Sequence, residues 1–99
     1  MLPFERLKRS NTIENLWIWI LLLLKEKEIH AWDIKKEIEK NFSFKPGKIT
    51  PYRVLYRLEK QGFVKSKLKE RRRIYKITKK GIEELEKAKK FYQEILKKL

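Results

Sequence analysis

The sequence has 99 residues, enough for one domain and too few for a second. Its 27 Lys and Arg residues against 13 Asp and Glu residues give a net charge of +14, and its pI is about 10.1. This balance favours an anionic partner, either a nucleic acid or the acidic surface of a membrane. The absence of cysteine excludes disulfides and thiol chemistry and is consistent with a reducing cytoplasm.

The most apolar segment is LWIWILLLL, residues 16–24. A membrane-spanning helix needs roughly 20 such residues, so we expect no membrane span, and the KEKE that follows is unlike a signal-peptide cleavage site. A helix that is apolar on all sides is buried on all sides. The segment therefore predicts a buried helix over about residues 12–27, with Asn11 and Glu14 as a capping box. Residues 1–11 are predicted to form an N-terminal arm.

A second helix is predicted over about residues 31–41, where Ala31, Ile34 and Ile38 recur at helical spacing. The brief connection before it contains His30, the only histidine. No cysteine or second histidine lies near it, so we interpret His30 as a turn or cap residue. We expect no metal site, no catalytic residue and no cofactor.

The segment TPYRVLYRLEKQG, residues 50–62, carries the signals of a short helix at both ends. Thr50 suits the N-cap, Pro51 the first helical position, and Gly62 the left-handed position after the last turn. One face of this helix is apolar, and the opposite face combines aromatic and basic residues with no acid at its centre. Arg and Tyr can reach base edges, which favours the recognition helix of a helix-turn-helix in the major groove of double-stranded DNA. The residues assigned to DNA here are Lys45, Lys48, Thr50, Tyr52, Arg53, Tyr56, Arg57 and Lys60.

After Gly62 the apolar period changes to two, which predicts strands over residues 63–68 and 73–78. Three consecutive arginines stand at this junction beside a cationic helix, Arg71 and Arg72 between the strands and Arg73 at the start of the second. They favour the interpretation that the hairpin is a wing whose tip contacts the DNA backbone, and not one whose tip is only solvated. The wing residues assigned to DNA are Lys69, Arg71, Arg72 and Arg73.

Thr78 is the expected cap of a final helix that extends to Leu99. Its apolar residues follow a three–four spacing, which indicates a coiled-coil seam of about two heptads. Nothing left in the sequence covers this seam, so we expect a homodimer, in which the partner also covers part of the apolar first helix. The residues assigned to the dimer interface are Trp17, Ile20, Leu21, Leu24, Leu85, Ala88, Tyr92, Ile95 and Leu99.

Three segments together resemble the PadR-like transcriptional regulators, a branch of the winged-helix proteins. They are HAWDI (30–34), PGKITPYRVLYRLEKQGFV (46–64) and RRRIYKITKKGIEEL (71–85), in the order of the family and near its spacing. Ala31 replaces the usual glycine of the first motif, and the wing tip KERR lacks the common Gly or Pro. The resemblance implies a mainly α fold with a small β-hairpin, a winged helix-turn-helix with N-terminal and C-terminal dimerisation helices. It also implies a homodimer that binds operator DNA, usually as a repressor.

Family members often sense small molecules, but this sequence identifies no effector. The three tryptophans Trp17, Trp19 and Trp32 could line an effector pocket, and we favour core packing for all three. We thus predict one winged-helix domain over residues 1–99, with an arm (1–11), the winged helix (12–78) and a dimerisation helix (79–99).

The predicted function is a sequence-specific DNA-binding transcriptional regulator in the cytoplasm, acting as a repressor. The alternative is a sequence-neutral architectural protein that uses the same charges on the DNA backbone alone. A membrane-surface protein is disfavoured, because the first helix lacks the polar face that interfacial helices require. An enzyme is the poorest fit, because the acids are scattered among lysines on exposed faces.

Overall fold

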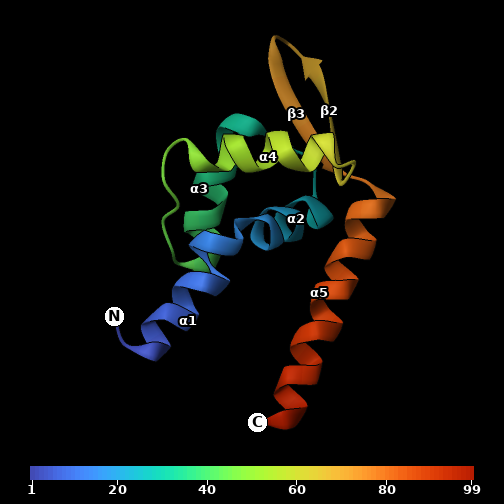
Figure 1. Cartoon of the computed structure of the whole chain (residues 1–99). Coiled ribbons are helices and arrows are strands. Elements are labelled where there is room, and N and C mark those ends of the chain that lie inside the picture. The colour runs from blue at the N-terminus through green and yellow to red at the C-terminus, as the bar shows by residue number, and fades with distance from the viewer.

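The computed structural model describes all 99 residues. Its elements are α1 (Pro3–Asn11), the 3-10 turn η1 (Ile13–Asn15), α2 (Leu16–Glu26), β1 (Ile29–His30), α3 (Ala31–Phe42), α4 (Thr50–Lys60), β2 (Val64–Lys69), β3 (Arg72–Ile77) and α5 (Lys79–Lys98). The β2–β3 hairpin projects at one end of the molecule, and both chain termini lie towards the other (Figure 1). The predicted winged helix-turn-helix, mainly α with a small hairpin, is confirmed.

The sheet has one strand more than the sequence predicts. It is antiparallel with the order β1-β3-β2, so β3 is central and β2 is an edge strand. The added strand, β1, pairs Ile29 with Tyr75 and His30 with Ile74. We expected only a connection there, because a strand of two residues is too short to show an alternating pattern.

The N-terminal region differs from its prediction. Residues 1–11, predicted only as an arm, are mostly helical in α1, and the long predicted first helix is divided into η1 and α2. Asn11 ends α1 instead of capping the next helix, since its Nδ2 donates back to the Leu7 carbonyl at 2.8 Å. The Asn11 carbonyl accepts from Trp19 Nε1, also at 2.8 Å, and the Glu14 carboxylate pairs with an arginine of α1. The predicted capping box is therefore wrong.

The core gathers around α2, which packs on α3, α4, α5 and β3. Three residues that we assigned to a dimer interface, Ile20, Leu21 and Leu24, lie in this core and are covered by their own chain, the first two with no exposed surface. Leu85 is also buried there. These four side chains keep between 0% and 9% of their surface exposed and offer a partner almost no contact, so their assignment is corrected. Conversely Leu22 is exposed, so α2 is not buried on all sides.

The three tryptophans behave differently from one another. Trp19 packs on Phe42 and Phe44, with ring centroids 4.7 and 5.4 Å away, and so fixes the start of the loop between α3 and α4. Trp17 is half-buried against the core. Trp32 is 79% exposed at the start of α3, so its predicted packing in the core is wrong.

The hairpin closes through a two-residue turn, Glu70–Arg71, in which both residues have positive φ (53° and 67°). A turn with two left-handed residues matches the twist of the flanking strands, although Asn and Gly are the usual residues there. Gly62 after α4 also has a positive φ, 85°, as its predicted left-handed position requires. The wing is therefore a tight hairpin despite the absence of Gly or Pro at its tip.

The start of α5 is fixed to the end of α4. Thr78 caps α5 as predicted, because its Oγ1 accepts from the Gly81 amide at 3.1 Å, and the same hydroxyl donates to the Gly62 carbonyl at 2.6 Å. Gly81 lies so close to β2 that an added Cβ would sit 2.2 Å from the Phe63 carbonyl oxygen. Only glycine fits there without movement of the backbone.

We therefore expect Gly81→Ala to lower the free energy of unfolding by about 1–3 kcal/mol, the usual range for a residue too large for its site. Urea denaturation followed by circular dichroism measures this change. Gly47→Ala is the matched control, since its Cβ would meet only the Thr50 Oγ1, at 3.1 Å. Equal stability losses in the two variants would contradict the close approach at Gly81.

Candidate nucleic-acid interface

The outer face of α4 gathers aromatic and basic side chains around one shallow surface hollow of about 530 Å³. The helix forms as predicted because Pro51, Leu55 and Leu58 are buried on its inner face. The five residues that line the hollow are all exposed: Tyr52, Arg53, Tyr56, Arg57 and Lys60. Within this group the Lys60 Nζ lies 5.1 Å from the centre of the Tyr56 ring. The structure thus brings together five of the six α4 side chains that we assigned to DNA, and Thr50 is the one outside the hollow.

The N-terminal end of α4 differs in one detail from its prediction. Ile49 is the N-cap, with helix-like backbone angles, and Thr50 is the first helical residue. The carbonyl of Ile49 accepts from the amides of Tyr52 and Arg53 at 3.1 and 3.3 Å, so the Thr50 hydroxyl caps nothing. Lys45 and Lys48 in the preceding loop are exposed, and the end of α4 that they precede is where a helix dipole favours an anion.

The three arginines of the wing do not project together. Arg71 lies in the turn, and residues that follow one another along β3 point to opposite faces of the sheet. Arg72 therefore lies opposite Lys69 on the outer face of the hairpin. Arg73 lies on the inner face, where its Nη1 donates to Ser66 Oγ at 2.8 Å. The predicted cluster at the tip thus consists of Lys69, Arg71 and Arg72.

A short hydrogen-bonded chain joins the wing to α4. Ser66 Oγ, which accepts from Arg73, donates to Glu59 Oε2 at 2.6 Å. Burial raises the pKa of the neighbouring Tyr75 hydroxyl, and the Glu59 carboxylate raises it further. Sequence reasoning missed this chain, because Glu59 and Ser66 follow no pattern that identifies them as partners. It fixes the direction in which the hairpin leaves the helix.

The basic residues of this surface carry positive charge that no carboxylate neutralises. The ion pairs of the structure join Arg9–Glu14, Lys27–Glu37, Lys35–Glu39, Lys87–Glu84 and Lys97–Glu94. None of them includes a basic residue of α4, of its preceding loop or of the wing. An unpaired, exposed set of cations around a helix that presents two tyrosines suits contact with phosphate and with base edges.

Comparison with known proteins agrees with this geometry. A model of the transcriptional regulator PadR-like family matches residues 20–87, which include α4 and the whole hairpin. The chain belongs to the PadR-like family of transcriptional regulators. No functionally curated protein matches the sequence significantly.

Solved structures with the same fold include other PadR-family regulators. A transcriptional regulator from Clostridium thermocellum is 26% identical, covers 98% of this chain and 93% of its own, and has a TM-score of 0.79. A PadR family regulator from Clostridium difficile is 26% identical, covers 83% of this chain and 91% of its own, and has a TM-score of 0.75. F93 from STIV, described as a winged-helix DNA-binding protein, shares the fold at 22% identity, 82% and 89% coverage and a TM-score of 0.71.

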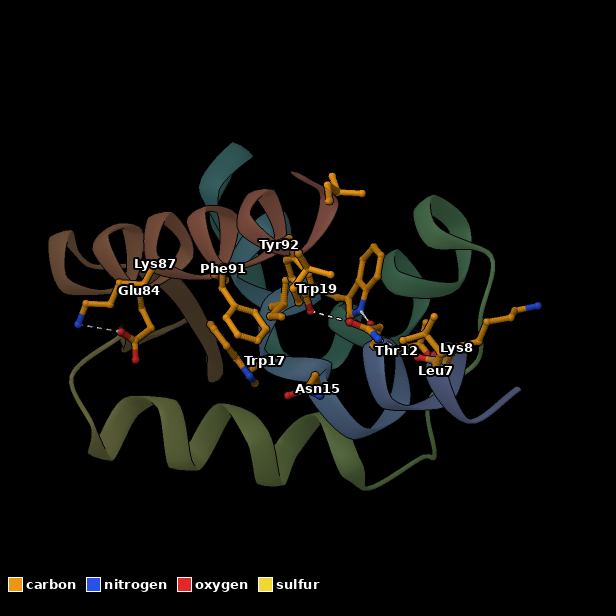
Figure 2. A pocket seen from close by; sticks show the side chains of 15 residues that line it. Leu7, Lys8, Thr12, Asn15, Trp17, Trp19, Glu84, Lys87, Phe91 and Tyr92 are labelled. Carbon is orange, nitrogen blue, oxygen red and sulfur yellow. Dashed lines mark hydrogen bonds and ion pairs between the residues drawn. The ribbon is translucent and has the colours of Figure 1, made fainter. Parts of the chain in front are cut away.

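Outside the winged helix, the PadR-like chain carries an apolar groove of about 980 Å³ between α5 and the α1–α2 segment. Phe91 and Tyr92 of α5 point across it towards Trp17 and Trp19 (Figure 2). The Tyr92 hydroxyl donates to Asn11 Oδ1 at 2.8 Å and so ties α5 to α1. Five residues that we assigned to the dimer interface remain accessible to some degree on this side of the chain: Trp17, Ala88, Tyr92, Ile95 and Leu99.

Two further observations concern the classes of site that the sequence disfavours. No helix is both long and apolar enough to cross a membrane. No group of three or more His, Cys, Asp or Glu side chains is placed to hold a metal ion. His30 lies at the N-cap position of α3 without a side-chain capping bond, and its Nδ1 is buried without a hydrogen-bond partner.

Proposed function

We propose that this PadR-like regulator binds a specific double-stranded DNA sequence as a homodimer and represses transcription from it in the cytoplasm. In this proposal α4 enters the major groove and the wing tip contacts the backbone. The supporting observation is the outer face of α4, where Tyr52, Arg53 and Tyr56 stand exposed among unpaired cations. Purely electrostatic binding needs cations alone, whereas exposed aromatic rings and an Arg in the first two turns suit direct contact with bases.

The homodimer is supported by the apolar surface beside the groove. Phe91 is 63% exposed and Leu96 is 68% exposed, both on its α5 wall. Exposed apolar side chains continue past the groove, at Phe4 on α1 and Leu99 on α5. A small ligand would leave those outlying residues in water. A second copy of α5 is long enough to cover them, so we assign the groove and its margins to the partner subunit.

Selection from a pool of random duplexes tests the proposal. A two-fold dimer presents two α4 helices, so the enriched sequence is expected to be a pseudo-palindrome. Its half-sites should lie about 10 base pairs apart, or a multiple of that, so that both major grooves face the protein. Enrichment of no sequence would contradict specific binding and support the architectural alternative. A single, unrepeated half-site would contradict the two-fold dimer.

A further inference from the structure

One face of the hairpin carries basic side chains at every strand position except Ile74, and the residues assigned to DNA include only part of it. In an antiparallel pair, residues opposite one another point to the same side, and Lys65 pairs with Lys76 as Lys69 pairs with Arg72. Lys67 lies between them on the same side by alternation. We call these five residues the outer face: Lys65, Lys67, Lys69, Arg72 and Lys76. All five side chains are exposed.

Nothing in the chain neutralises this face. None of its five cations takes part in an ion pair, and the only acid of the hairpin, Glu70, lies in the turn. Two of its cross-strand pairs, Lys65–Lys76 and Lys69–Arg72, place like charges directly opposite one another, which destabilises a hairpin. An anion bound between the strands would relieve this repulsion.

The basic residues of the outer face are not confined to the edge strand. Lysines on an edge strand discourage pairing with other chains, and this explains the three lysines of β2. Arg72 and Lys76 lie on β3, which pairs with β2 on one side and, at Ile74 and Tyr75 alone, with β1 on the other. The charge therefore spreads across the whole face.

The direction of the outer face indicates that the anion it would bind is the DNA backbone. The opposite face of the hairpin packs towards α4, as the bond from Ser66 to Glu59 shows, so the outer face is turned away from α4. The hairpin also lies at the other end of the molecule from the chain termini and the C-terminal half of α5 (Figure 1). In the proposed complex, with α4 in the major groove, this face would be turned towards the duplex that continues past the half-site, away from the α1–α5 side assigned to the partner subunit.

We propose that the outer face is a second phosphate-binding surface, which holds the DNA backbone that flanks each half-site beyond the wing. This inference rests on the proposed function, because it takes the position of the duplex from α4. It adds Lys65, Lys67 and Lys76 to the residues that contact DNA. It also makes the footprint of the dimer longer than the sequence that it reads.

Two duplexes that share the selected site test this surface. One ends at the outer edge of each half-site, and the other continues for about one helical turn on both sides with mixed sequence. Wild-type protein is expected to bind the extended duplex at least about tenfold tighter at low salt. The dependence of log K on log salt should be steeper by about 0.9 for each added phosphate contact.

The variant Lys65→Gln, Lys67→Gln, Lys76→Gln should lose most of this gain and keep its affinity for the short duplex within about threefold. The matched control is Lys25→Gln, Lys89→Gln, Lys90→Gln, which removes the same charge from exposed positions on α2 and α5. The variant with arginine at positions 65, 67 and 76 keeps the charge and should retain the gain.

The outcomes separate the two proposals. If wild type gains nothing from flanking DNA but still prefers its selected site, the outer-face proposal is overturned and the proposed function stands. Equal losses in the test variant and the control would mean that net charge alone is responsible, and would also overturn it. Binding to anionic vesicles that depends on these lysines, with an unchanged gain from flanking DNA, would assign the face to membrane lipid instead. Failure to prefer any duplex would overturn both proposals.

Discussion

Replacing Ile95 with aspartate is expected to convert the proposed homodimer into a folded monomer at micromolar concentration. Ile95 lines the groove and is 41% exposed in the single chain, so the partner subunit would bury it. An unpaired charge buried in such an interface costs about 3–5 kcal/mol, which raises the dimer dissociation constant by at least about 100-fold. Sedimentation equilibrium in the analytical ultracentrifuge measures this change.

Gln93→Asp provides the control, because it introduces the same charge on α5 at an exposed residue that does not line the groove. It should leave the dissociation constant nearly unchanged. A wild-type protein that sediments as a well-folded monomer at these concentrations would rule out the proposed dimer. Equal weakening by both substitutions would show that the charge of α5, and not the seam at Ile95, controls association.

The second large effect is expected from Arg53→Ala. Arg53 lies in the first two turns of α4, the part of a recognition helix that meets bases in helix-turn-helix proteins. It is exposed and lines the hollow together with Tyr52 and Tyr56. If Arg53 reads a base, its removal should cost binding to the selected duplex about 1–3 kcal/mol more than binding to a scrambled duplex. Titrations of wild type and variant on both duplexes, at one salt concentration, give this difference directly.

Arg71→Ala is the matched comparison, because Arg71 lies at the turn of the wing, where we propose backbone contact. Its loss should weaken both duplexes by a similar factor. If Arg53→Ala also weakened both duplexes alike, Arg53 would contact phosphate only, and specific reading by this side chain would be wrong.

The parts of the fold that sequence predicts well are those whose signals are local. The end of α4 follows from Gly62 and its start, to within one residue, from Pro51; the cap of α5 follows from Thr78, and the hairpin from two alternating strands. The signal that places residues on the outer face of α4 is equally local, because side chains at helical spacing share a face in any environment. This is why the five exposed residues of α4 were found together.

The parts that sequence misses depend on partners distant in the chain or on competition between hydrogen bonds. Apolar periodicity shows that Ile20 and Leu21 are covered but cannot show by which chain, and here their own chain covers them. Asn11 carries a capping signal, yet its amide bonds back to α1. Arg73 looks like part of a basic tip, but strand alternation turns it towards Ser66.

The turn of the wing affects both the stability of the hairpin and its proposed contact with DNA. Glu70 and Arg71 adopt left-handed backbone conformations, each of which costs a non-glycine residue roughly 1–2 kcal/mol. Asn-Gly at the same two positions would remove most of this strain, but it would also remove Arg71, one of the residues proposed to contact the DNA backbone, together with the acid Glu70. Relief of the backbone strain at this turn would therefore sacrifice the proposed contact of Arg71 while leaving the net charge of the turn unchanged.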